Sequence, residues 1–155
     1  MSELKTGDLA PNFNMPTDGG AGVELSALLG KNIVLYFYPK DDTPGCTTEA
    51  IDFSTLIADF DAANTVVIGV SKDTVAKHDK FKAKHELKIV LGSDEEGKVL
   101  EAYGVWVLKK LYGREYMGIE RATFLIDTQG KIAQIWRKVK VKGHAQAVLD
   151  AVQSL

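Results

Sequence analysis

The chain has 155 residues, 45% of them hydrophobic and 26% charged, and its formal net charge is −2. This composition is typical of a globular protein, so residues 1–155 are expected to form a single domain. The near-neutral charge gives no indication of nucleic-acid binding, and no apolar run approaches the ~20 residues of a membrane-spanning helix. One cysteine and no N-terminal apolar run of signal-peptide length favour a reducing, cytoplasmic compartment.

The first half of the chain alternates between strand and helix patterns. Short β-branched and aromatic runs indicate buried strands, and apolar residues at helical spacing indicate helices. In chain order, we expect a glycine-rich turn at 17–22, a strand at 33–38, a helix at 47–63, a strand at 65–70, a helix at 74–85 and a strand at 88–91.

The second half has a different order, in which a strand hairpin is followed by a helix. We expect residues 93–96 to cap a short helix that runs to about 103. Strands are expected at 122–127 and 132–138, joined by a turn at 128–130, and a closing helix at 143–155. Strands and helices that alternate first and then give way to a hairpin predict an α/β fold. The predicted architecture is a mixed central sheet flanked by helices.

The only cysteine, Cys46, lies between the strand expected at 33–38 and the helix expected at 47–63. A strand, a tight turn and a helix start place this thiol near free backbone N–H groups at the positive end of a helix. Such surroundings favour the thiolate, which is the reactive form of cysteine. A lone cysteine is otherwise most often a small buried hydrophobe, so its neighbours decide the interpretation.

Pro39, Thr43 and Cys46 follow the spacing Pro-x-x-x-Thr-x-x-Cys, which is similar to the active-site signature of the peroxiredoxins. The surrounding string resembles the peroxiredoxin Q group, also called bacterioferritin comigratory protein. Three separated stretches carry the resemblance, namely residues 7–13, 36–50 and 118–127. The last of them looks like the family's segment with a catalytic arginine, which would be Arg121 here.

The resemblance implies a thioredoxin-like fold and thiol-dependent reduction of hydrogen peroxide and organic hydroperoxides. In the implied cycle the Cys46 thiolate attacks the peroxide and becomes a sulfenic acid. Thr43 would orient the peroxide, Arg121 would hold thiolate and peroxide together, and Pro39 would shield the sulfur from solvent. Gly45 would let a small substrate approach the backbone. Neither a metal nor an organic cofactor is implied, because the sulfur carries the redox change.

Three residues of this region have plain structural alternatives. Thr43 could serve as the N-cap of the following helix. Arg121 could be a surface ion-pair partner of Glu120 or Asp127. Glu49 could complement the helix dipole in the first turn, or it could support the arginine.

One departure from the group concerns the second thiol. Many members carry another cysteine five residues after the first, where this chain has Ile51, a plausible packing residue. Recycling of Cys46 would therefore need an external thiol of the thioredoxin, glutaredoxin or glutathione type, and the resemblance implies a monomer. Lys138, Lys140 and Lys142 would share one strand face, which could discourage edge association or steer an acidic reductant.

Two other functions remain open at this point. A thiol–disulfide oxidoreductase on the same fold would require Cys-x-x-Cys, but the position three after Cys46 is Glu49. A non-catalytic interaction module would be expected to lack Thr43, Cys46 or Arg121, and all three are present. Peroxidase activity is the stronger prediction.

Several other polar residues receive no functional assignment. Asp41 and Asp42 are adjacent and lack a cluster of ligands, so a solvated turn is favoured over a metal site. His78, His85 and His144 are scattered along the chain and are expected at the surface of helices.

Overall fold

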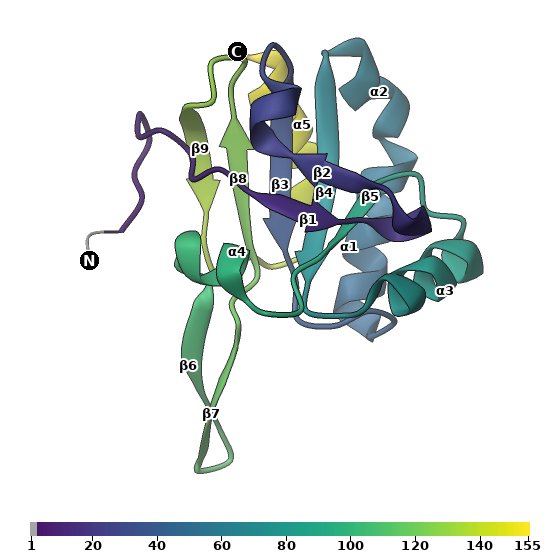
Figure 1. Cartoon of the computed structure of the whole chain (residues 1–155), viewed down its shortest axis with the longest axis vertical. Helices are drawn as coiled ribbons and strands as arrows, with labels where there is room; N and C mark the ends of the chain where they lie inside the picture. The colour runs from purple at the N-terminus through teal and green to yellow at the C-terminus, as the bar shows by residue number, and fades with distance from the viewer. Residues whose placement is uncertain (1–2) are drawn as a thin grey trace.

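The computed structural model describes residues 3–155, and its centre is a five-stranded sheet (Figure 1). The strands are β3 (Asn32–Phe37), β4 (Thr65–Ser71), β5 (Val90–Ser93), β8 (Ala122–Ile126) and β9 (Ile132–Trp136). Their order is β5-β4-β3-β8-β9. β3, β4 and β5 are parallel, whereas β8 pairs antiparallel with both β3 and β9. The predicted α/β fold with a mixed sheet is confirmed.

Both faces of the central strand are buried, so its side chains alternate between two apolar cores. Ile33, Leu35 and Phe37 join one core, and Val34 and Tyr36 join the other, which also contains Cys46. Figure 1 shows the β1–β2 ribbon and α4 in front of the sheet and α5 behind it. The elements outside the sheet are β1 (Asn14–Pro16), β2 (Gly22–Glu24), α1 (Pro44–Thr55), α2 (Ile57–Ala62), α3 (Val75–His85), α4 (Lys98–Ala102) and α5 (His144–Gln153).

The helices differ from the predicted ones mainly at their ends. The helix expected at 47–63 starts earlier, at Pro44, and breaks at Leu56 into α1 and α2. The short helix expected after residues 93–96 is α4, which begins at Lys98, and Asp94 accepts a hydrogen bond from the backbone N–H of Leu100. None of the helices between residues 3 and 155 has the length and apolar character needed to cross a membrane.

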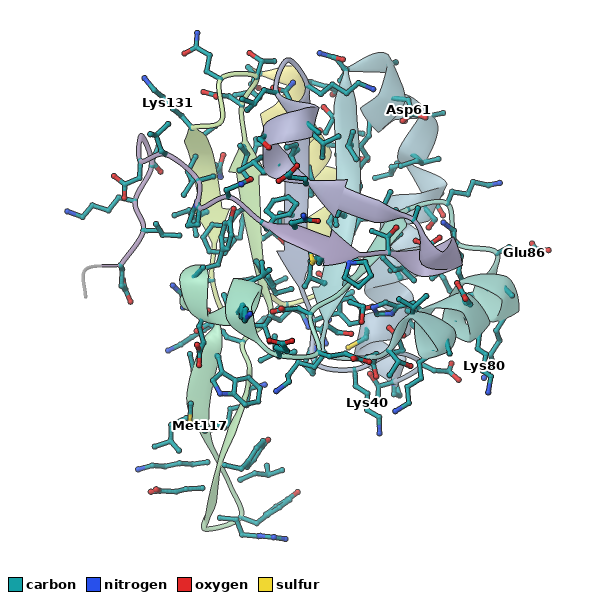
Figure 2. The ribbon with its side chains drawn as sticks, in the orientation of Figure 1. Lys40, Asp61, Lys80, Glu86, Met117 and Lys131 are labelled. Atoms are coloured by element: carbon teal, nitrogen blue, oxygen red, sulfur yellow. The ribbon has the colours of Figure 1, made fainter. Side chains whose placement is uncertain are left out.

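A second hairpin was missing from the sequence prediction. β6 (Trp106–Leu111) and β7 (Arg114–Ile119) pair antiparallel and project away from the sheet (Figure 1). Figure 2 shows Met117 on this projection, and Tyr112 at its tip is 95% exposed. Because most of the hairpin lies outside both cores, its sequence lacks the apolar alternation that identifies half-buried strands.

The lysines after β9 do not form a strand face. β9 ends at Trp136, and Lys138 has a left-handed backbone with φ of 48°. Glu120 binds both the Arg137 side chain and the backbone N–H of Lys138. The chain therefore leaves the sheet here, and the predicted strand over 132–138 is wrong in its last two residues.

Candidate active site

Cys46 occupies the third position of α1, in the first turn of the helix. Thr43 is the residue that precedes the helix, and its carbonyl accepts the first helical hydrogen bond from the N–H of Thr47 at 2.8 Å. Pro44 has no N–H to lose at the first helical position. The N–H groups of Gly45 and Cys46 have no acceptor within the helix, so the turn that carries the sulfur also carries two free backbone donors.

The Thr43 side chain does not cap the helix, although the residue stands at the capping position. Its hydroxyl donates to the carbonyl oxygen of Lys40 at 2.8 Å, which leaves the hydroxyl oxygen able to accept. The capping alternative is therefore wrong for the side chain.

The pairing of β8 with β3 brings Arg121 close to Cys46. Arg121 directly precedes β8, whose first residue, Ala122, pairs with Phe37 at the end of β3, just before the loop that leads to Cys46. Arg121 Nη2 donates to Cys46 Sγ at 3.2 Å, and Nη1 donates to Glu49 Oε1 at 2.6 Å. A positive donor interacts more strongly with a sulfur anion than with a neutral thiol.

The surface ion pair weighed for Arg121 is absent. Glu120 instead accepts a hydrogen bond from Arg137 at 2.7 Å, and Arg121 is paired with Glu49. Glu49 of α1 thus contacts Arg121, just before β8, as the supporting alternative for Glu49 required. Gly45 contributes space, because a Cβ atom at this position would lie 3.3 Å from Arg121 Nη2.

Glu49 is buried, and its Oε2 atom has no hydrogen-bond partner within residues 3–155. Burial raises the pKa of Glu49 to about 7, against the opposing effect of the Arg121 charge. The carboxyl beside the arginine is therefore partly protonated near neutral pH, and less of the Arg121 charge is neutralised than in an ordinary ion pair.

The raised pKa of Glu49 predicts a specific dependence of stability on pH. An acid with a raised folded-state pKa stabilises the fold fully below its ordinary pKa of 4.5, and this contribution is lost as pH rises towards about 7. Glu49→Gln keeps an oxygen for Arg121 but cannot ionise. We expect the free energy of unfolding of the unmodified protein to fall relative to this variant by up to about 3 kcal/mol across that window.

Urea unfolding of both proteins between pH 4.5 and 8 measures this difference, with the exposed Glu115→Gln as a control. Parallel stability curves for the unmodified protein and Glu49→Gln would show that Glu49 ionises normally in the fold.

Cys46 is almost closed to solvent, with 2% of the residue exposed. It borders apolar side chains of the second core, but its sulfur also contacts the guanidinium. Pro39 lies just beyond β3 and is exposed, so its shielding of the sulfur stays a prediction. Because so little of the residue is exposed, only a small ligand could reach the sulfur.

Ile51 lies elsewhere on α1. It is 40% exposed, and the expectation that it serves as a packing residue is not supported by that exposure. Five residues correspond to about 140° around a helix, so positions 46 and 51 point in different directions while α1 is intact.

Three of the residues left unassigned are buried, contrary to the prediction. Asp41 and His78 pair with each other inside the protein, whereas Asp42 stays exposed and binds Lys84 and His85. His144 is also buried, and burial lowers its pKa to about 4, with a smaller effect from Arg121. Within residues 3–155, no group of three or more His, Cys, Asp or Glu side chains is placed to hold a metal ion.

Comparison with known proteins gives a consistent result. Residues 6–135 match the AhpC/TSA family. The peroxiredoxin Bcp of Bacillus subtilis is 53% identical over 152 residues, which cover 98% of this chain and 95% of that protein. A solved structure of a cysteine-to-serine variant of Xylella fastidiosa PrxQ superimposes with a TM-score of 0.93 at 39% identity, covering 99% of this chain and 98% of that one.

A third similar structure is linked to a substrate class. The structure of Xanthomonas campestris bacterioferritin comigratory protein is described in connection with alkyl peroxide reduction. It has a TM-score of 0.88 at 45% identity and covers 92% of this chain and 90% of that one.

Proposed function

The chain belongs to the AhpC/TSA family and is a peroxiredoxin, and we propose that it reduces hydrogen peroxide and organic hydroperoxides at Cys46. One observation carries this proposal, the hydrogen bond from Arg121 Nη2 to Cys46 Sγ. Two segments 75 residues apart in sequence are folded together so that a permanent cation meets the only thiol.

The proposed reaction begins when the Cys46 thiolate attacks one peroxide oxygen. An S–O bond forms as the O–O bond breaks, sulfur is oxidised to a sulfenic acid, and the leaving oxygen takes a proton to become water or an alcohol. Negative charge builds on the leaving oxygen. Arg121 and the free N–H groups of Gly45 and Cys46 are donors that can stabilise it.

Thr43 is proposed to orient the peroxide. Its hydroxyl proton is already engaged by Lys40, so its oxygen is available to accept the proton of the substrate O–H group. An orienting group of this kind lowers the barrier by holding the reacting atoms in line before the reaction starts.

The second half of the proposed cycle uses an external thiol. A thiol attacks the sulfenic sulfur, water leaves and a mixed disulfide forms, and a second thiol releases Cys46. Thioredoxin, glutaredoxin or a glutathione-type thiol could act in this way. An internal disulfide is impossible because the chain has no second cysteine.

Without added thiol, turnover is therefore not sustained, and one equivalent of peroxide per chain is expected to convert Cys46 to the sulfenic acid. Intact-mass spectrometry should then show one added oxygen, or a mixed disulfide when a small thiol is supplied. Ile51→Cys is a matched variant that should form an internal disulfide on oxidation, with a loss of two hydrogens and local opening of α1. Sustained turnover of the unmodified protein without any thiol would contradict the proposed cycle.

A further inference from the structure

The loop between β3 and α1 is tied to α3 by a buried contact. His78 of α3 is fully buried, and its Nδ1 atom lies 2.6 Å from Oδ2 of Asp41 in the loop. The opposite ring nitrogen, Nε2, lies 2.9 Å from the carbonyl oxygen of Gly92 in β5. Figure 2 shows Lys40 of the loop and Lys80 of α3 projecting from the same edge of the molecule, where these segments meet.

The two hydrogen-bond partners of His78 determine which of its ring nitrogens are protonated. A carbonyl oxygen can only accept, so Nε2 must carry a hydrogen and donate to Gly92. A carboxylate also only accepts, so Nδ1 must donate to Asp41. Both nitrogens are thus protonated, and His78 is a buried cation held between one anion and one backbone dipole. Burial opposes this charge, but the hydrogen bond and charge of Asp41 outweigh it and raise the pKa of His78.

Asp41 is held from the other side as well. Its Oδ1 atom accepts a hydrogen bond from the Tyr38 hydroxyl at 2.5 Å, and its backbone N–H donates to Asp73 Oδ2 at 2.8 Å. Ser71 also donates to that Asp73 oxygen, at 2.7 Å. The loop therefore has a fully paired polar anchor two residues before Thr43, and Asp41 and Asp73 are the acidic groups that face His78.

A second histidine–aspartate pair joins the same loop to the same helix at the surface. His85 Nε2 lies 2.9 Å from Asp42 Oδ1, and the Asp42 side chain is 45% exposed. Water can replace either partner there, so an exposed pair of this kind contributes little. In the buried pair, loss of one partner leaves the other charge without compensation, which is costly.

We propose that His78 is a positioning residue of the peroxidase site, which acts through Asp41 to hold residues 39–43 in the place that Thr43 and Cys46 require. This inference rests on the proposed function of Cys46. Loss of the pair would release the loop from α3 and move the Thr43 hydroxyl and the first turn of α1 relative to Arg121. Displacement of reacting groups by about 1 Å costs on the order of 10²-fold in rate.

The pair also predicts an effect of alkaline pH. A histidine with a raised folded-state pKa contributes fully below its ordinary pKa of about 6.5, and the contribution is lost as pH rises through the folded value. When His78 loses one of its two ring protons, a nitrogen lone pair faces either the Asp41 carboxylate or the Gly92 carbonyl oxygen, and that contact becomes repulsive. The rate of Cys46 oxidation should therefore decline at alkaline pH, above the ordinary histidine range.

Asn and Gln at position 78 can test the two contacts of His78 separately, because each retains a different one. Asn can place its N–H₂ group where Nδ1 lies, which keeps the bond to Asp41, whereas Gln can reach the position of Nε2 and keeps only the bond to Gly92. We expect the rate constant for Cys46 oxidation by hydrogen peroxide to fall by ~10-fold or more in His78→Gln. It should stay within about threefold in His78→Asn, which should also lose the alkaline decline. His85→Asn, the control from the pair with the exposed Asp42, should match the unmodified protein.

Stopped-flow oxidation at several pH values, with near-ultraviolet circular dichroism to check the fold, measures these effects. Equal rates in His78→Gln and His78→Asn, or a rate for the unmodified protein without an alkaline decline, would overturn the inference. The pH profile needs no variant and decides the matter if neither variant folds. Failure of the unmodified protein to react at all would instead contradict the proposed function of Cys46.

Discussion

Cys46→Ser is expected to abolish peroxide consumption. A serine hydroxyl is not ionised at neutral pH, and its oxygen cannot be oxidised to an analogue of sulfenic acid. The substitution changes one atom and leaves the contact with Arg121 possible, so the fold should be preserved. Peroxide consumption by equal amounts of both proteins, in the presence of excess thiol, measures the effect.

Ile51→Ser is a suitable control, because it introduces the same side chain at an exposed position of the same helix. It should retain the full rate. Residual activity in Cys46→Ser above the uncatalysed rate would mean that another group reacts with the peroxide.

Replacement of Arg121 should give the second-largest effect. Arg121→Met removes the charge and both donating nitrogens while keeping an unbranched, apolar stem of similar reach. Loss of one donor in comparable oxyanion sites reduces the rate by ~10²–10³-fold, and we expect a decrease of that order in the rate constant for Cys46 oxidation. Arg121→Lys keeps the charge, but one ammonium group lacks the planar fork that serves Cys46 and Glu49 together, so it should recover only part of the rate.

The Arg137–Glu120 pair provides the control for this experiment. Arg137→Met removes a similar arginine–glutamate contact, at 2.7 Å, from a position that does not touch the sulfur. Its oxidation rate should be unchanged. Equal losses in Arg121→Met and Arg137→Met would indicate a general effect on the fold, and an unchanged rate in Arg121→Met would contradict the role proposed for the guanidinium.

The fold was predictable where local pattern and burial agree. The run at 33–38 is nearly all β-branched, aliphatic or aromatic, and it became the central strand. The hairpin of β8 and β9 was also predicted, since its turn residues and apolar runs are distinct. The β6–β7 hairpin was not, because most of it lies outside both cores and its sequence records no burial pattern.

The site was predictable in its residues but not in its contacts. Cys46 and Glu49 are three residues apart, so a shared helix face could be inferred. That Arg121 bridges both depends on the pairing of β8 with β3, which no local pattern reveals. The burial of His78 did leave a signal, because it stands three residues before an apolar residue, Phe81, on the same helix face. Its partner, Asp41, could not be identified from sequence.

The proposed reaction transfers oxygen from the peroxide to one thiolate, which Arg121 holds. Its most direct test is titration of the reduced protein with hydrogen peroxide, followed by a sulfenic-acid trapping reagent and peptide mass spectrometry. One equivalent of peroxide should be consumed per chain, and the trapped adduct should lie on Cys46. Consumption of peroxide with Cys46 still a free thiol, or with oxidation confined to methionine, would contradict it.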